Sequence, residues 1–198
     1  MPTRGTKEKI MTKVVFDISL SVDGFMTADG ITPKEPLGQD GQRLHAWATD
    51  DEIERAPNPV STVGALIAGR RTYETSLPWW GAGGPHPPIP VFVVTHGAVE
   101  PAPADSVYTL VTGGIEAALG QARAAAGNQD VRIMGGASLG QQFLAAGLVD
   151  EIVLHVVPVL LKGGIRMFDK LGPGHVGLEV LDVINSTAAM HLRYRVTR

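Results

Sequence analysis

The most chemically suggestive segment of the chain is "ALIAGRRTYE", in which an apolar run ends at Gly69 and is followed by Arg70, Arg71 and Thr72. A helix that begins here presents free N–H groups and the positive end of its dipole. Two guanidinium groups add fork-shaped donors that suit phosphate oxygens. These residues predict a phosphate-binding helix start. The alternative is that both arginines are solvated charges on a helix face.

Two more apolar runs end in residues of this kind. "VRIMGGASLG" places Gly135 and Gly136 between a strand-like run and a helix-like run, so that the backbone could approach a pyrophosphate without the obstruction of a Cβ atom. "VFVVTH" ends in Thr95 and His96, whose hydroxyl and imidazole could hold a ribose or an adenine. Ligands of open α/β sheets bind at the carboxyl ends of strands, where these three segments would meet.

Adjacent glycines alone do not identify a nucleotide site. "VTGGIEAALG" repeats the strand, Gly-Gly and helix order at Gly113 and Gly114, so at least one of the two turns is expected to be a structural cap. Neither turn has the G-x-G-x-x-G spacing of the Rossmann fingerprint. We expect the Gly135–Gly136 turn to face phosphate and the Gly113–Gly114 turn to be structural.

Composition limits the classes of protein that remain. The chain has 198 residues, a net charge of −3, 44% hydrophobic residues and no cysteine. These values predict a soluble globular protein with no nucleic-acid footprint, no membrane span and no thiolate metal site, and we expect it in the cytoplasm. Residues 1–11 do not resemble a signal peptide, and we interpret them as a disordered lead or a cloning remnant. Residues 12–198 are expected to form one domain.

Strand-like and helix-like segments alternate along most of the chain. The expected strands are 14–20, 64–68, 91–95, 107–111, 131–134 and 151–160, followed by a C-terminal hairpin within 178–196. Helices are expected at 42–56, with a break near residue 50, and after residues 69, 113 and 137. Residues 21–41 and 78–90 are rich in glycine and proline and are predicted loops. The pattern indicates an α/β fold with a mostly parallel sheet and an antiparallel edge.

Together these motifs resemble the dihydrofolate reductase-like superfamily. "GRRTYE" is similar to its adenosine-phosphate segment, and "FDISLSVDGFMT" to its first strand and turn. "IMGGASLGQQFLAAGLVDEIVLHVVPVLLKGGIRMF" resembles the C-terminal reductase domain of bacterial riboflavin-biosynthesis deaminase–reductases. The resemblance implies a three-layer fold, with a central sheet of about eight strands and helices on both faces.

The resemblance also implies a cofactor, NADPH, extended along the strand ends. Arg70 and Arg71 would face the adenosine 2′-phosphate, which favours NADP over NAD, and Ser19 on the first strand would contact the nicotinamide carboxamide. The implied cofactor-binding set is Ser19, Gly69, Arg70, Arg71, Thr72, Thr95, His96, Gly135, Gly136, Ala137, Ser138 and Leu139.

The sequence departs from dihydrofolate reductase at the substrate. That enzyme has a carboxylate at the start of the helix after the long loop, whereas "GQRLHAWAT" offers Arg43 and His45. Asp17 shares a strand face with Ser19, which makes it the candidate catalytic acid or substrate contact. We interpret Asp23 as a turn residue and His155 as a satisfied structural residue.

Trp47, Trp79 and Trp80 could form an aromatic wall for a planar substrate, together with Asp17 and His45, or they could be dimer contacts. The histidines show no metal-ligand spacing, so no metal site is expected.

The leading hypothesis is an NADPH-dependent reductase that transfers a hydride to a small planar heterocycle. One alternative is a nucleotide-binding module without turnover, and another is an enzyme that binds a flavin or a sugar nucleotide in the same cleft. The riboflavin-type relatives are commonly dimers, and "EIVLHVVPVL" is apolar on both faces, so we expect a homodimer.

Overall fold

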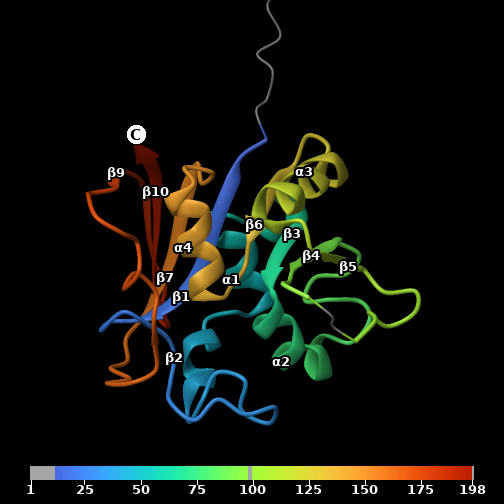
Figure 1. Cartoon of the computed structure of the whole chain (residues 1–198). Coiled ribbons are helices and arrows are strands. Elements are labelled where there is room, and N and C mark those ends of the chain that lie inside the picture. Colours follow the sequence, from blue (N-terminus) through green and yellow to red (C-terminus); the bar gives the residue numbers. More distant parts are fainter. Residues whose placement is uncertain (1–11, 98–99, 198) are drawn as a thin grey trace, which may run out of the picture.

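A computed structural model describes residues 12–97 and 100–197 of the chain (Figure 1). Eight strands form one sheet in the order β5-β4-β3-β6-β1-β7-β10-β9. They are β1 (Val14–Ser21), β3 (Val63–Gly69), β4 (Val91–Val94), β5 (Tyr108–Val111), β6 (Asp130–Ile133), β7 (Glu151–Val157), β9 (Gly177–Asn185) and β10 (Met190–Thr197). The helices are η1 (Gly41–His45), α1 (Asp50–Arg55), η2 (Val60–Thr62), α2 (Arg70–Trp80), α3 (Gly114–Ala126) and α4 (Ala137–Ala145).

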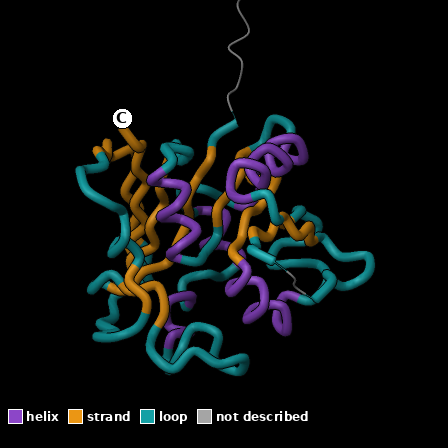
Figure 2. Tube along the Cα trace, viewed as in Figure 1, coloured by secondary structure: helices purple, strands orange, loops and turns teal. Residues whose placement is uncertain are grey.

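The first six strands of the sheet run parallel, and the C-terminal hairpin of β9 and β10 joins antiparallel to β7. The predicted mostly parallel sheet with an antiparallel C-terminal hairpin is therefore confirmed. Figure 2 shows the helices on both sides of the strands. None of the helices within the described ranges is long and apolar enough to cross a lipid bilayer.

Side chains of β1 alternate between the two faces of the sheet. Val14 and Phe16 point into the larger core, where they pack with residues of α3 and α4. Gly140 of α4 allows a close approach, since a Cβ atom there would overlap the ring of Phe16. The alternate residues of β1, including Asp17, point to the opposite face.

The opposite face is covered by α2 and by the η1–α1 segment. Tyr73 of α2 packs in a second cluster with Leu66 and Val91. Leu44 and Trp47 form a third cluster against the end of β7. The two faces therefore have separate cores, and the face that carries Asp17 is open between the second and third clusters, where a cleft forms.

Two sequence-based expectations about local structure are wrong or incomplete. Residues 78–90 were expected to be a loop throughout, but α2 continues through Pro78 and Trp79 to Trp80. Trp80 packs against the second core cluster, and this burial outweighs the backbone hydrogen bond that proline cannot donate. The two-stranded sheet of β2 (Phe25–Thr27) and β8 (Ile165–Arg166) was not expected, because strands of three and two residues show no periodicity.

The strand β7, expected to lie in an interface or a covered sheet, lies inside the sheet between β1 and β10. Exposed apolar side chains are found instead on the edge hairpin, at Leu178, Val180, Val183 and Met190.

Candidate functional site

A cleft of about 1260 Å³ opens at the carboxyl ends of the parallel strands. Its walls include the ends of β3, β4 and β6, the exposed face of β1 and the first turns of α2 and α4. Every residue of the sequence-predicted cofactor and substrate sets contributes to the lining of this cleft. The topology explains the convergence, because the carboxyl ends of parallel strands share one edge.

The "GRRT" and Gly-Gly segments are joined by a hydrogen bond. The backbone N–H of Gly136 donates to Thr72 Oγ1 over 3.1 Å. Gly135 has φ of 82°, in the left-handed region that favours glycine, and a Cβ atom there would meet the Thr72 side chain. Thr72 and Gly136, 64 positions apart in the sequence, therefore join the two motifs into one continuous wall of the cleft.

The helices α2 and α4 both begin at this wall without a side-chain cap. Gly69 and Gly136 occupy their N-cap positions and offer no side-chain oxygen to the first-turn N–H groups. Two uncapped helix starts facing the same cleft favour an anionic ligand. Ala137 and Leu139 of α4 are buried, whereas Ser138 is exposed.

The two arginines at the start of α2 differ in their partners. Arg70 Nε donates to Glu74 Oε1 over 2.7 Å, one turn along the helix. Arg71 is exposed and, within the described residues, has no ion-pair partner. Arg71 is therefore the guanidinium that an anion can reach without breaking an existing pair.

Thr95, just beyond the end of β4, is 2% exposed, and its hydroxyl oxygen has no hydrogen-bond partner within the described structure. A buried hydroxyl without a partner is energetically costly unless a ligand or a water satisfies it. Its neighbour His96 is exposed at the same rim. Both residues lie where the sequence predicted them, at a strand end in the cleft wall.

At the other end of the cleft, Ser19 is buried and its hydroxyl oxygen accepts a hydrogen bond from Trp47 Nε1 over 2.9 Å. Its own hydrogen remains available as a donor. The predicted contact of Ser19 with a carboxamide is therefore compatible with the geometry only if Ser19 donates to the carboxamide oxygen.

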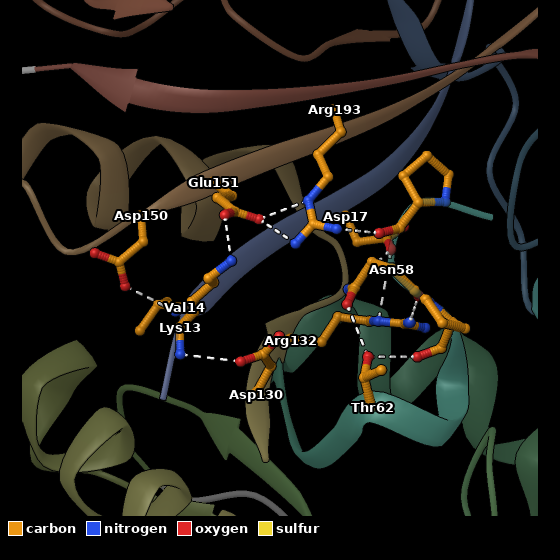
Figure 3. A network of polar contacts seen from close by, with 12 residues as sticks. Lys13, Val14, Asp17, Asn58, Thr62, Asp130, Arg132, Asp150, Glu151 and Arg193 are labelled. Carbon is orange, nitrogen blue, oxygen red and sulfur yellow. Dashed lines mark hydrogen bonds and ion pairs between the residues drawn. The ribbon is translucent and has the colours of Figure 1, made fainter. Parts of the chain in front are cut away.

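Asp17 lies at the centre of a buried polar cluster. Its Oδ1 lies 2.9 Å from His155 Nε2, and its Oδ2 accepts from Asn58 Nδ2 over 3.3 Å and lies 3.5 Å from Arg132 Nε. Figure 3 shows Asp17 with Asn58 and Arg132, and Arg132 also donates to the backbone carbonyl of Asn58. Three strands and the segment after α1 thus meet at one carboxylate.

Burial by itself raises the pKa of Asp17, but the positive charge of Arg132, followed by the charge and hydrogen bond of His155 and the Asn58 amide, lowers the pKa of Asp17 to about 2. The group is therefore a carboxylate at neutral pH. In this resting state it can accept hydrogen bonds from a ligand but holds no proton to donate.

His155 is satisfied, as the sequence suggested, and it also lines the cleft. Its Nδ1 lies 2.7 Å from Nδ1 of His191 on the neighbouring strand β10. The Trp47 ring stacks on His155 with a centroid distance of 3.9 Å. Trp47 thus belongs to the Asp17 cluster.

The three tryptophans all line the cleft, but they differ in burial and in their contacts. Trp47 is 7% exposed and its ring contacts are with His155 and His191. Trp79 is 63% exposed at the end of α2, and Trp80 packs into the second core cluster. Trp79 and Trp80 are the last two residues of α2.

His45 lies in the cleft wall, where desolvation and then the nearby His155 lower its pKa below 6.5. His86 lies across the cleft, and its pKa is lowered by burial and then by the Arg132 guanidinium. Both imidazoles are therefore neutral at neutral pH. Within the described residues no group of three His, Asp or Glu side chains is arranged to hold a metal ion.

Sequence reasoning missed Asn58, His86, Arg132 and His191 as members of the site. Arg132 could have been found, because it is a charged residue inside the short buried strand "VRIM" and must have a partner there. Asn58 and His86 lie in irregular segments, and their positions depend on tertiary contacts that leave no periodic signal.

Asp23 also does more than stabilise its own turn. It accepts hydrogen bonds from Ser21 Oγ and from the backbone N–H groups of Leu161 and Lys162. The Ser21 bond, ahead of the two backbone bonds, lowers the pKa of Asp23 to about 2. This carboxylate links the turn after β1 to the segment after β7.

Comparison with known proteins agrees with this geometry. The model of the RibD C-terminal domain family matches residues 12–192. The chain belongs to the RibD C-terminal domain family. None of the curated protein sequences matches it.

Solved structures show the same fold. A protein from Shewanella sp. PV-4, assigned by its name to riboflavin biosynthesis, is 25% identical, with 95% of this chain and 100% of that chain covered and a TM-score of 0.69. Dihydrofolate reductase from Enterococcus faecalis, complexed with NADP(H), is 16% identical, with 94% and 97% covered and a TM-score of 0.59. The fold is therefore dihydrofolate reductase-like.

A Thermotoga maritima diaminohydroxyphosphoribosylaminopyrimidine deaminase/5-amino-6-(5-phosphoribosylamino)uracil reductase is 14% identical, with 94% of this chain and 57% of that chain covered and a TM-score of 0.59. The present chain thus spans somewhat more than half of that protein. Family and fold together place the chain among RibD C-terminal domains with a dihydrofolate reductase-like fold.

Proposed function

We propose that the protein is an NADPH-dependent reductase that transfers a hydride to a small planar heterocycle of the pyrimidine or pteridine kind. The observation that carries the proposal is the single cleft in which the joined Thr72 and Gly135–Gly136 wall faces the Asp17 cluster. One end has phosphate-binding features and the other has hydrogen-bonding groups for a polar ring. This arrangement suits a dinucleotide and a second reactant held side by side.

The residues at the first end fit a dinucleotide. The uncapped starts of α2 and α4 would hold the pyrophosphate, and the buried, unpartnered hydroxyl of Thr95 would gain a partner from the adenosine. Gly135 has no Cβ atom, so a ligand can approach its backbone closely. Its positive φ disfavours any residue that has a Cβ atom.

The choice of NADPH over NADH rests on the arginine pair. A 2′-phosphate adds charge that a guanidinium can bind in a bidentate manner. Arg71 is free to do so, and Arg70 could join by exchanging Glu74 for the phosphate. Glu74 would then control how strongly the pair attracts the extra phosphate.

A bound reduced nicotinamide supplies the hydride, and the protein positions the reactants, excludes water and provides a proton. Asp17, as a carboxylate, would accept hydrogen bonds from ring N–H groups of the substrate. This role corresponds to the carboxylate of dihydrofolate reductase, supplied here from β1 instead of from the helix after the long loop. The neutral imidazoles of His45 and His86 offer further polar contacts along the cleft.

The proposal includes a homodimer. The exposed apolar side chains of the β9–β10 hairpin offer a surface for a second copy, because contiguous exposed apolar groups mark interaction sites. Sedimentation of the wild type and of the Val180→Glu variant would test this, and a monomeric wild type would contradict it.

Turnover tests the main proposal. We expect NADPH oxidation when the protein is given 5-amino-6-(5-phosphoribosylamino)uracil, the compound in the name of the Thermotoga relative, or dihydrofolate. Asp17→Asn should lower kcat/KM about a hundredfold, while the Kd for NADPH changes less than about twofold. NADPH binding without oxidation of NADPH by any heterocycle would instead indicate a nucleotide-binding module.

A further inference from the structure

A line of four polar groups crosses the sheet from the cleft to the turn between β9 and β10. Asp17 Oδ1 lies 2.9 Å from His155 Nε2, the two Nδ1 atoms of His155 and His191 are 2.7 Å apart, and His191 Nε2 lies 3.3 Å from Ser186 Oγ. The register of the strands places His155 beside Ser19 on one side and directly opposite His191 on the other. The line thus spans β1, β7, β10 and the β9–β10 turn.

The hydrogens of this line all point the same way. Asp17 is ionised, because its pKa is about 2, so it must accept from His155 Nε2–H. With the His155 hydrogen on Nε2, its Nδ1 atom is the acceptor in the contact with His191, which donates its Nδ1–H. His191 Nε2 is left as an acceptor for the Ser186 hydroxyl.

Ser186 is placed to receive hydrogens from outside. Its Oγ accepts from the backbone N–H groups of Ala188 and Ala189, and its own hydrogen can reach either His191 Nε2 or the Ala189 carbonyl. Ser186 is half-buried at the turn, whereas His155 and His191 are each 1% exposed. The outer end of the line is therefore accessible to water and its middle is not.

The surroundings bury both imidazoles, each of which is 1% exposed. Trp47 stacks on His155 and meets His191 edge-on at 5.0 Å. The charged or titratable groups that face the pair are Asp17 of β1, Arg132 beside it on β6, His45 of η1 and Glu52 of α1. Desolvation and then His155 lower the pKa of His191.

We propose that Ser186, His191 and His155 form a proton relay that connects solvent at the β9–β10 turn with Asp17 in the cleft. The proposal rests on the reductase function, since hydride transfer in a cleft filled by two ligands requires a proton that water in the cleft cannot bring. A relay that runs across β7 and β10 supplies this proton without opening the cleft.

The transfer balances in four concerted steps. Water at the turn gives a proton to Ser186 Oγ, whose hydrogen passes to His191 Nε2. His191 passes its Nδ1 hydrogen to His155 Nδ1, and His155 passes its Nε2 hydrogen to Asp17 Oδ1. Asp17, now neutral, gives that proton to the substrate and is a carboxylate again.

The same steps in reverse restore the starting tautomers. After the product leaves, water in the open cleft protonates Asp17, and each hydrogen moves back one place until a proton leaves at the turn. Neither imidazole has to rotate, which the stack against Trp47 would hinder.

Exchange of the His155 Nε2 hydrogen with solvent, followed by NMR on imidazole-labelled protein, tests the relay directly. The key variant is His191→Asn, whose amide N–H can still donate to His155 Nδ1 but cannot pass a proton on. We expect the wild type to show His155 as the Nε2–H tautomer and His191 as the Nδ1–H tautomer. The variant should keep the His155 tautomer but slow its exchange by about tenfold or more.

Equal exchange rates in the wild type and in His191→Asn would overturn the relay, as would a His155 that carries its hydrogen on Nδ1. If His191→Asn does not fold, Ser186→Ala leaves both imidazoles in place and should slow the exchange as well, and an unchanged rate there overturns the proposal too. The measurement needs neither NADPH nor substrate. A protein that slows exchange in these variants but reduces no heterocycle would disprove the reductase function and keep the relay.

Discussion

Two turns of this molecule have the same local form and different surroundings. Gly113–Gly114 follows β5 and begins α3, and Gly135–Gly136 follows β6 and begins α4. Gly114 has φ of 83° and Gly135 has φ of 82°, so the backbone conformation favours glycine equally at both positions. Only the second turn lines the cleft and bonds to Thr72.

The difference shows that the glycines do not make a ligand site by themselves. A Cβ atom at Gly114 would meet open space, and one at Gly113 would meet only Ala117 of its own helix. A Cβ atom at Gly135 would meet Thr72 from a different element. The position of β6 next to β1 and β3 brings its turn against α2, whereas β5 lies at the edge of the sheet.

The largest expected effect is a difference in NADPH affinity between alanine variants of the two turns. Gly135→Ala and Gly114→Ala should each destabilise the fold by about 1 kcal/mol, because both place a Cβ atom at positive φ. Gly135→Ala should in addition weaken NADPH binding about a hundredfold by displacing the backbone that approaches the pyrophosphate. Urea unfolding and NADPH titration measure the two quantities. Equal affinities of the two variants for NADPH would show that the turns are equivalent.

A smaller effect concerns the cluster beneath the second turn, where Arg132 of β6 pairs with Asp17. The pKa of Asp17 is lowered from 3.8 to about 2, so the carboxylate stabilises the folded state by about 2 kcal/mol at pH values above 3.8, and this contribution disappears as the pH falls toward 2. The free energy of unfolding of Asp17→Asn should therefore lie below that of the wild type at pH 6, with a difference that shrinks between pH 4 and pH 2.

The control for Asp17→Asn is a substitution of Asp105, an exposed residue between β4 and β5. Asp105→Asn should leave the free energy of unfolding at pH 6 unchanged, because the side chain is exposed. A difference between the wild type and Asp17→Asn that does not vary with pH would mean that Asp17 is not a buried, paired carboxylate.

The smallest effect tests the bond that joins the second turn to α2. Thr72→Val removes the acceptor of the Gly136 N–H and should weaken NADPH binding about fivefold, or about 1 kcal/mol. Thr75→Val is the matched control, because the hydroxyl of Thr75 bonds only to carbonyls of α2 itself. If both variants bind NADPH alike, the bond between Thr72 and Gly136 does not organise the site.

Much of the fold could be predicted from the sequence because periodicity records which face of a strand is buried. Val14 and Phe16 alternate with Val15 and Asp17, and β1 has that register in the structure. The paired glycines and the "GRRT" segment mark where strands end, so the predicted phosphate wall follows from the order of elements. The short strands β2 and β8 carry no such signal.

The substrate end could be predicted only in part. Asp17 and Ser19 were identified from the face that they share, but the partners of Asp17 come from β6, β7 and the segment after α1. Those contacts depend on the strand order, which no local pattern reveals. The helical conformation of Trp79 and Trp80 likewise depends on whether α2 can continue through Pro78, which tertiary packing decides.

NADPH and NADH titrations of the wild type and of the Arg70→Ala, Arg71→Ala double variant, followed by tryptophan fluorescence, test the central claim most directly. Trp47 and Trp79 line the cleft and report on its occupancy. The account predicts that the wild type binds NADPH, and that the double variant loses about a hundredfold in NADPH affinity but less than about threefold in NADH affinity. An Arg123→Ala variant, altered on the exposed surface of α3, should match the wild type. Equal losses for the two nucleotides, or no binding of either below about millimolar concentration, would contradict the account.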